Sequence, residues 1–202
     1  MLLLSAILLR ERMRESGIVT IDGVDLRNVK FKSLRRCVSI VLQEPYLFQG
    51  TLRYNLKFGR PDASNDDMIR ISKLVGIHEP ISKLANGYDE EVSERGSSLS
   101  YGQRQLVCLA RALITDPKIL ILDEATSSVD PYTEQLIQNA LKAEMSNRTI
   151  IIVTHRVSTV RDADRIVVLD HGQVQDSGTH EYLEKNSELY RHLCEMQLVR
   201  VP

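Results

Sequence analysis

The sequence predicts an α/β fold in which helices cover a mainly parallel sheet. Strand-length apolar runs alternate with helix-length amphipathic segments along most of the chain. From Ile119 onward these runs carry apolar residues at consecutive positions, as strands buried on both faces of a parallel sheet do. With 202 residues, of which 43% are hydrophobic and 26% charged, the chain is long enough for one well-packed domain.

Two strands are predicted in the first part of the chain. The first, over residues 19–21, ends at the Asp22-Gly23 turn. The second, over residues 38–42, cannot continue past Pro45, because proline lacks the backbone donor that a strand interior needs.

The region from about 52 to 113 is mainly helical in pattern, which predicts a helical subdomain inserted between strands. Its last helix repeats apolar residues at the i, i+3, i+4 and i+7 spacing of one buried face. The residues with this spacing are Leu106, Leu109, Ala110 and Leu113. The other elements predicted here are a helix over 66–75, ended by Gly76, and a surface loop over 86–98.

Three more strands follow this region, and further helices accompany them. A helix is predicted to begin after Asp130, because aspartate caps helices and Pro131 suits their first position. It runs to about Met145. The other predicted elements are strands over 119–122, 149–153 and 166–169, a turn at His171-Gly172, a return strand around Val174, and helices from 181 to 198.

The composition excludes several classes of protein. Lys and Arg total 26 against 27 for Asp and Glu, so the chain is not a nucleic-acid binder that works by bulk charge, and we expect no nucleic-acid partner. The apolar stretch over 1–9 is too short to span a bilayer, which takes ~20 residues. Three cysteines without metal-ligand spacing predict buried, reduced thiols.

A short motif at residues 100–103 carries the first sign of chemistry. Ser100 and Gln103 fit the S-x-x-Q capping box just before an apolar helix. A glycine in the first turn, Gly102, lets an anion approach the backbone N–H groups, and the helix dipole favours negative charge there. The motif therefore predicts a phosphate clamp with Ser100 as a hydroxyl donor. A well-capped helix without a ligand is the alternative.

Two adjacent carboxylates, Asp123 and Glu124, follow the apolar run at 119–122. Ligands of open α/β sheets bind at the carboxyl ends of the strands. One carboxylate there can hold Mg²⁺, and the other can orient or deprotonate an attacking water. The alternative is a carboxylate that only caps a helix.

Two more polar residues follow predicted strands. His155 comes after the strand over 149–153, and Gln43 after the strand over 38–42. An imidazole at this edge could reach a phosphate, and a glutamine amide oxygen could contact a metal or water. Each alone has a plain structural alternative, but three strand ends that meet at one edge favour a site.

Taken in order, these motifs resemble those of the nucleotide-binding domain of an ATP-binding-cassette (ABC) transporter. The resemblance covers about residues 1–197. The matching segments are 99–103 (the signature motif, with Tyr101 where Gly is commoner), 119–124 (the Walker B strand and catalytic glutamate), 128–130 (the D-loop), His155 (the switch histidine) and Gln43 (the Q-loop glutamine).

The resemblance implies a P-loop NTPase-like layered sheet with a signature-bearing helical subdomain, and it implies ATP and Mg²⁺ as cofactors. The roles implied are catalysis for Glu124, His155 and Gln43, and Mg²⁺ binding for Asp123 and Gln43. The others are contact with the ATP of a partner domain for Ser100, Gly102 and Gln103, and a dimer loop for Ser128 and Asp130.

Finer resemblance indicates the exporter branch. Residues 47–52, after Gln43, and 91–96, before the signature, are exporter-like, and the second segment touches the coupling helices of the membrane domain in that branch. The implied function is ATP hydrolysis that powers export across a membrane. The implied partners are a second nucleotide-binding domain, paired head to tail, and a membrane-spanning domain that holds the chain at the cytoplasmic face of the cell membrane.

One departure from the family stands out, because no G-x-x-x-x-G-K-[ST] loop occurs in the sequence. Since residues 2–12 resemble the end of the helix after that loop, we expect a single partial domain over 1–202 that lacks the first strand and phosphate loop and is inactive alone. The alternative is a non-hydrolytic remnant or regulatory module that acts only through its signature. Chromosome- or repair-type ATPases are disfavoured because no heptad stretch appears.

Overall fold

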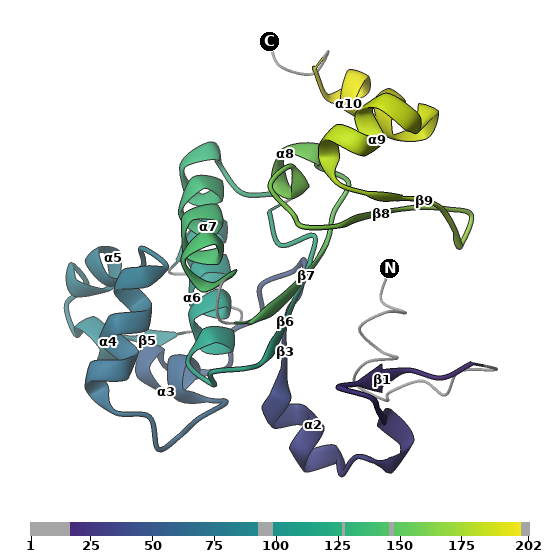
Figure 1. Cartoon of the computed structure of the whole chain (residues 1–202). Coiled ribbons are helices and arrows are strands. Elements are labelled where there is room, and N and C mark those ends of the chain that lie inside the picture. The colour runs from purple at the N-terminus through teal and green to yellow at the C-terminus, as the bar shows by residue number, and fades with distance from the viewer. Residues whose placement is uncertain (1–16, 93–98, 127, 146–147, 199–202) are drawn as a thin grey trace. The chain divides into compact units, whose positions relative to one another are not determined.

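The computed structural model describes residues 17–92, 99–126, 128–145 and 148–198. They fall into two compact units, one up to Val153 and one from Thr154 onward, and each is described by itself. Mixed helices and strands occur in both, so the predicted α/β class is confirmed (Figure 1). The single domain over 1–202 stays a prediction.

A parallel sheet of three strands lies at the centre of the first unit, in the order β3-β6-β7. The central strand β6 is the most buried, and its Ile121 is 1% exposed. Register pairs Val41 of β3 with Leu122 of β6, and Leu122 with Ile152 of β7, so the three strands end at the same edge. The strands are β3 (Val38–Val41), β6 (Ile119–Asp123) and β7 (Thr149–Val153).

Alternate residues of β6 face opposite layers, as the pleat of a strand requires. Leu120 and Leu122 belong to the large core with the helices of the unit, whereas Ile121 belongs to a smaller core on the other face. The smaller core is covered by the β1–β2 hairpin, by η1 and by α2 (Figure 1). These elements are β1 (Thr20–Ile21), β2 (Val24–Asp25), η1 (Leu26–Asn28) and α2 (Phe31–Cys37).

Helices α3 to α6 occupy the region in which the sequence predicts a helical subdomain, and its bounds of about 52 to 113 stay a prediction. Its helices share the large core with the sheet, and α6 packs on α3, α4 and β3. The elements are β4 (Gly50–Thr51), α3 (Leu52–Lys57), α4 (Asn65–Leu74), α5 (His78–Ser82), η2 (Gly87–Asp89), β5 (Glu91–Val92) and α6 (Tyr101–Leu113).

The loop predicted over 86–98 is partly wrong. It contains η2 and the strand β5, which pairs antiparallel with the distant strand β4. Two-residue strands have no periodicity that a sequence can display, so only the pairing reveals them. Residues 93–98, the rest of that loop and most of the exporter-like segment 91–96, lie outside the described residues.

Helix α7 (Pro131–Glu144) begins after its predicted cap and packs on α6. The second unit contains α8 (Val157–Val160), β8 (Ile166–Asp170), β9 (Gln173–Gly178), α9 (His180–Asn186) and α10 (Glu188–Leu198). Strand β8 is not of the parallel type that the sequence predicts, because it pairs antiparallel with β9. Its burial explains this pairing, since Ile166 and Val168 are buried while Val167 and Leu169 are exposed, so only one face is covered.

Candidate functional site

The carboxyl ends of β3 and β6 place the predicted residues side by side. Gln43 lies two positions beyond Val41, and Glu124 lies two positions beyond Leu122, the residue that pairs with Val41. The backbone N–H of Glu124 donates to the carbonyl oxygen of Val153 at 2.8 Å, which joins this edge to the end of β7. The structure therefore brings Gln43, Asp123 and Glu124 to one edge of the sheet.

Asp123 ends β6 with a carboxylate that folding has desolvated. The residue is 7% exposed, and its Oδ1 atom accepts no hydrogen bond within the described part of the chain. Burial raises the pKa of the Asp123 carboxyl, and the charge of Glu124 raises it further. A buried carboxylate oxygen without a partner is costly unless a cation or donor reaches it, so Asp123 fits the Mg²⁺ that the sequence predicts.

Glu124 sits in a strained turn. Its φ angle of 48° lies in the left-handed region, which non-glycine residues seldom adopt. Such strain tends to collect at functional sites, where the surrounding structure holds it in place. Here the hydrogen bond from its N–H to Val153 helps to fix the backbone that presents the half-buried Glu124 side chain.

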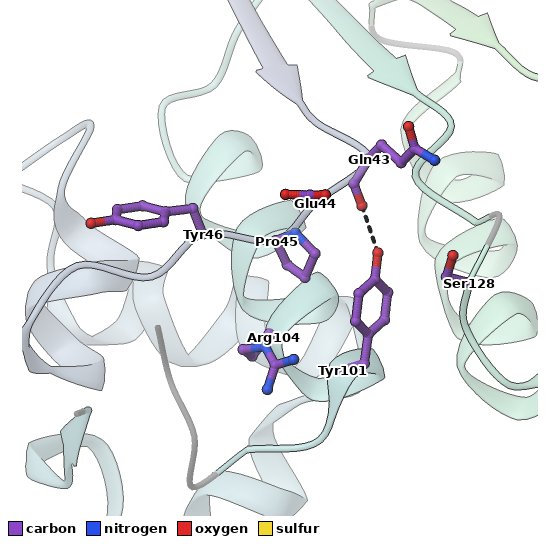
Figure 2. Close-up of a pocket in the computed structure, with 7 residues that line it drawn as sticks. All are labelled: Gln43, Glu44, Pro45, Tyr46, Tyr101, Arg104 and Ser128. Atoms are coloured by element: carbon purple, nitrogen blue, oxygen red, sulfur yellow. Dashed lines mark hydrogen bonds between the residues drawn. The ribbon is translucent and has the colours of Figure 1, made fainter. Parts of the chain in front are cut away.

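Gln43 lines a pocket of about 490 Å³ together with Glu44, Pro45, Tyr46, Tyr101, Arg104 and Ser128. Figure 2 shows the side-chain amide of Gln43 directed away from Tyr101, while its backbone carbonyl faces the Tyr101 hydroxyl. That hydroxyl donates to the Gln43 carbonyl oxygen at 2.8 Å. Ser128, predicted to belong to a dimer loop, is exposed at the same pocket.

The predicted capping box at the start of α6 is confirmed. The Oγ atom of Ser100 accepts from the Gln103 N–H at 3.1 Å, and the Gln103 Oε1 atom accepts from the Ser100 N–H at 2.9 Å. A serine hydroxyl has one donor and two acceptor sites, so this contact uses one acceptor only. The arrangement fixes the exposed Ser100 hydroxyl at the positive end of the helix dipole.

Gly102 has a packing role that the sequence does not reveal. It is buried, and a Cβ atom added to it would lie 2.6 Å from Thr133 Oγ1 and 3.2 Å from Asp130 Oδ2. A side chain at this position would therefore have to displace the Thr133 side chain, which donates a hydrogen bond to Asp130. Its contact with the ATP of a partner stays a prediction.

Asp130 caps α7, as predicted. Its carboxylate accepts from the Thr133 hydroxyl at 2.6 Å and from the Thr133 N–H at 3.0 Å. These two hydrogen bonds hold the pKa of the Asp130 carboxyl below its usual value. The same carboxylate neighbours Gly102, so the predicted dimer loop is fixed next to the first turn of α6.

His155 belongs to the second unit, where its side chain is exposed. Its backbone carbonyl accepts from the Gln197 side-chain amide, and the neighbouring Arg156 N–H donates to Thr154 Oγ1 at 2.9 Å. Its place beside the carboxylates of the first unit stays a prediction.

Sequence reasoning missed three residues at this site, namely Tyr101, Gln105 and Thr133. For Gln105, the available signal was a polar side chain on the apolar face of α6. Tyr101 and Thr133 act through partners elsewhere in the fold, so no local pattern singles them out.

Comparison with known proteins identifies the family. The family model described as ABC transporter matches residues 2–127. The chain belongs to the ABC transporter family. The Bacillus subtilis protein YknV, described as an uncharacterized ABC transporter ATP-binding protein, is 50% identical over 181 residues, which cover 90% of this chain and 30% of that protein. The human mitochondrial iron-sulfur clusters transporter ABCB7 is 42% identical over 93% of this chain and 25% of its own.

A solved structure matches the whole fold of this ABC family member. The structure of a bacterial Atm1-family ABC exporter with ATP bound has a TM-score of 0.93 and 39% sequence identity, over 98% of this chain and 35% of that one. The predicted resemblance to an exporter nucleotide-binding domain, with its P-loop NTPase fold, is therefore confirmed. The chain spans less than a third of the length of the curated relatives named above.

Proposed function

We propose that this chain is an ATP-binding and ATP-hydrolysing module that powers substrate export by an ABC transporter. The observation that carries this proposal is the buried, unpartnered Oδ1 atom of Asp123 beside Glu124, at the same sheet edge as Gln43, in the part of the chain that the structure describes. With a nucleotide bound, one carboxylate of such a pair would hold Mg²⁺ and the other would position the attacking water. The exporter relatives support the direction of transport.

Each residue of the candidate site has a role that follows from the chemistry of its side chain. Asp123 and Gln43 would hold Mg²⁺, which neutralises phosphate charge when it is bound. Glu124 would orient the attacking water and accept its proton, because it stands beside Asp123 on a fixed backbone. His155 would donate to the γ-phosphate.

The signature residues would act on a second nucleotide-binding domain. Ser100 and the first turn of α6 present a hydroxyl and the positive end of a helix dipole to solvent, which suits the γ-phosphate of an ATP held by a partner. In this arrangement two domains pair head to tail, and ATP closes the pair. Hydrolysis then reopens it and drives the membrane-spanning domain.

An exposed aromatic cluster supports a partner in the membrane. Tyr46 contacts Phe48 edge to face, Phe48 stacks on Phe58 at 4.2 Å between ring centroids, and Tyr54 packs on Phe58. Tyr46, Tyr54 and Phe58 are each about half exposed. Exposed aromatic groups that cluster in this way are typical of protein interfaces, so we place the membrane-spanning domain there.

This partner would hold the chain at the cytoplasmic face of the cell membrane. Among the described residues, no helix of the chain itself is both long enough and apolar enough to cross a bilayer.

The test uses a partner nucleotide-binding domain that carries a phosphate loop. Adding the chain to this domain should raise its ATPase rate, and Ser100→Ala in the chain should remove the increase. A matched control is Ser82→Ala, which changes an exposed serine whose hydroxyl donates to the His78 carbonyl of its own helix. An absent increase with the unaltered chain contradicts the proposal.

Glu124→Gln separates hydrolysis from a purely regulatory role. In proteoliposomes that contain an exporter in which a phosphate loop precedes this sequence, the substitution should abolish hydrolysis at the site formed by Glu124 and leave nucleotide binding in place. Total ATPase activity that survives unchanged would instead favour a module that acts only through its signature.

A further inference from the structure

The first turn of α6 is tied to the residue that follows β3 by one phenol. Tyr101 donates its hydroxyl to the backbone carbonyl oxygen of Gln43 at 2.8 Å, although 58 positions separate the two residues in sequence. Both residues line the same pocket, and Figure 2 shows the hydrogen bond from the Tyr101 hydroxyl to the Gln43 backbone carbonyl. Tyr101 directly follows Ser100, the cap of the helix. The bond therefore joins the proposed phosphate contact to the backbone of Gln43.

Two more side chains of α6 contact the rest of this segment. Gln105 is fully buried and donates to the Leu42 carbonyl at 3.2 Å, and Arg111 donates to the Tyr46 carbonyl at 2.9 Å. Positions 101 and 105 lie one turn apart on the same face of α6, whereas the longer Arg111 side chain reaches the segment from a different side of the helix. Three backbone carbonyl oxygens after β3 thus accept hydrogen bonds from side chains of α6. A displacement of α6 should therefore move this segment with it.

Tyr101 is the one of these three residues that belongs to the predicted signature motif itself. The resembled motif more commonly has glycine at this position, which has no side-chain donor. The Arg104 guanidinium lies 5.7 Å from the Tyr101 ring centroid, and its Nη1 atom donates to the Leu99 carbonyl at 2.7 Å. The phenol is therefore packed against a side chain that is itself held in place.

We propose that Tyr101 is a positioning residue that ties Gln43 to the signature turn, so that phosphate bound at Ser100 is sensed at Gln43 of the same chain. Closure of a partner's ATP onto Ser100 pulls on the first turn of α6, and the Tyr101 hydroxyl carries this displacement to the Gln43 backbone. The inference rests on the proposed function, because it takes Ser100 as a phosphate contact and Gln43 as a ligand of metal or water.

This tether, the hydrogen bond from the Tyr101 hydroxyl to the Gln43 carbonyl, can be observed directly by NMR. Gln43-Glu44 is the single Gln-Glu sequence in the chain. Cell-free synthesis with carbonyl-¹³C glutamine and ¹⁵N glutamate therefore gives one carbonyl-to-amide correlation, which reports the Gln43 carbonyl alone. Tyr101→Phe keeps the ring and removes only the hydroxyl, so it should move this ¹³C resonance upfield, as the loss of a hydrogen bond does.

The control is Tyr182→Phe. Tyr182 also lies in the first turn of a helix, is about half exposed, and makes no hydrogen bond through its hydroxyl within the described part of the chain. This substitution should leave the Gln43 resonance in place. A resonance that Tyr101→Phe does not move overturns the tether, and melting temperatures of the three chains confirm that each is folded.

The second arm tests the sensing. Addition of a phosphate-loop-bearing partner domain with a non-hydrolysable ATP analogue and Mg²⁺ should shift the Gln43 resonance in the unaltered chain. The shift should fall severalfold in Tyr101→Phe. Equal shifts in both chains overturn the inference, because a merely structural role for Tyr101 predicts equality.

The partner's ATPase rate, measured in parallel, separates the two proposals. A raised rate with equal resonance shifts means that the signature works in trans and only the sensing role of Tyr101 fails. An unchanged rate together with an immobile Gln43 resonance in the unaltered chain means that the proposed function itself fails, and the sensing role fails with it.

Discussion

At the residue scale, the site is dominated by a carboxylate that the fold leaves in need of a partner. Asp123 is almost fully buried at the end of β6, and one of its oxygens has no hydrogen-bond donor in the described structure. In the unfolded chain, water donates hydrogen bonds to this oxygen. Folding removes that water without supplying a replacement donor, and this lowers the free energy of unfolding. A residue that lowers stability at a strand end is best explained by what it binds.

Replacing Asp123 by asparagine should therefore make the chain more stable and less active. Asp123→Asn removes the buried charge, and we expect the free energy of unfolding to rise by about 1 kcal/mol or more at neutral pH. The assembled exporter should require a higher Mg²⁺ concentration to reach half of its maximal ATPase rate. Denaturant unfolding and a Mg²⁺ titration measure the two effects, and a loss of both stability and activity would contradict this account.

The pH dependence of stability, compared between the unaltered chain and Asp123→Asn, gives an independent check. Because the pKa of Asp123 is raised in the folded chain, folded Asp123 keeps its proton at pH values where the unfolded chain has released it. Its contribution to stability is therefore present below the usual aspartate range and is lost as pH rises through the raised pKa. The asparagine variant has no such proton, so its stability advantage should grow across this window and vanish below it.

At the scale of elements, the contact between α6 and α7 fixes the geometry of the signature. The first turn of α6 lies against the capped first turn of α7, with Gly102 facing Thr133 and Asp130. Both turns are rigid, because one is held by a capping box and the other by the Asp130 cap. The signature and the predicted dimer loop therefore form one structural block.

Gly102→Ala tests this block. The added Cβ atom would lie 2.6 Å from Thr133 Oγ1, so the Thr133 side chain must shift and lose its hydrogen bond to Asp130. We expect the free energy of unfolding to fall by about 1–3 kcal/mol. Thr133→Ala removes the clashing atoms, and the double variant should recover part of the loss beyond additivity. The measurement is a double-mutant cycle by denaturant unfolding, and strictly additive effects would disprove the contact as the cause.

At the scale of the whole molecule, the chain consists of two compact units that carry different parts of the proposed machinery. The first unit carries Asp123, Glu124, Gln43 and the signature, and the second carries His155. If two such domains pair head to tail, as the proposed function has it, the complete site needs contributions from a second chain.

This pairing predicts how the assembled protein responds to ATP. In an exporter in which a phosphate loop precedes this sequence, Glu124→Gln should block hydrolysis and so prolong the ATP-closed pair of domains. Ser100→Ala should shorten it, because the phosphate loses its hydroxyl donor. A fluorescent pair placed on the two domains measures closure, and a closed state of equal lifetime in both variants would count against the proposed roles.

Much of the fold could be predicted because it depends on short stretches of chain. The apolar runs of β3, β6 and β7, the cap of α7 and the capping box of α6 are each decided by neighbours within a few positions. The candidate residues follow these strands in an order that by itself indicates the ABC transporter family. The predictions of a loop at β5 and of parallel pairing for β8 were wrong. The first depends on a distant partner strand, and the second depends on which face of the strand is covered.

The sequence by itself determined the family, the strands that end at the site and the chemical types of the residues placed there. Tertiary structure alone decided the unpartnered oxygen of Asp123 among the described residues, the contact of Gly102 with Thr133 and the hydrogen bond from Tyr101 to Gln43. The physical reason is the range of the interactions. Caps and periodic apolar faces are local, whereas desolvation and a bond across 58 positions exist only after the helices have packed on the sheet.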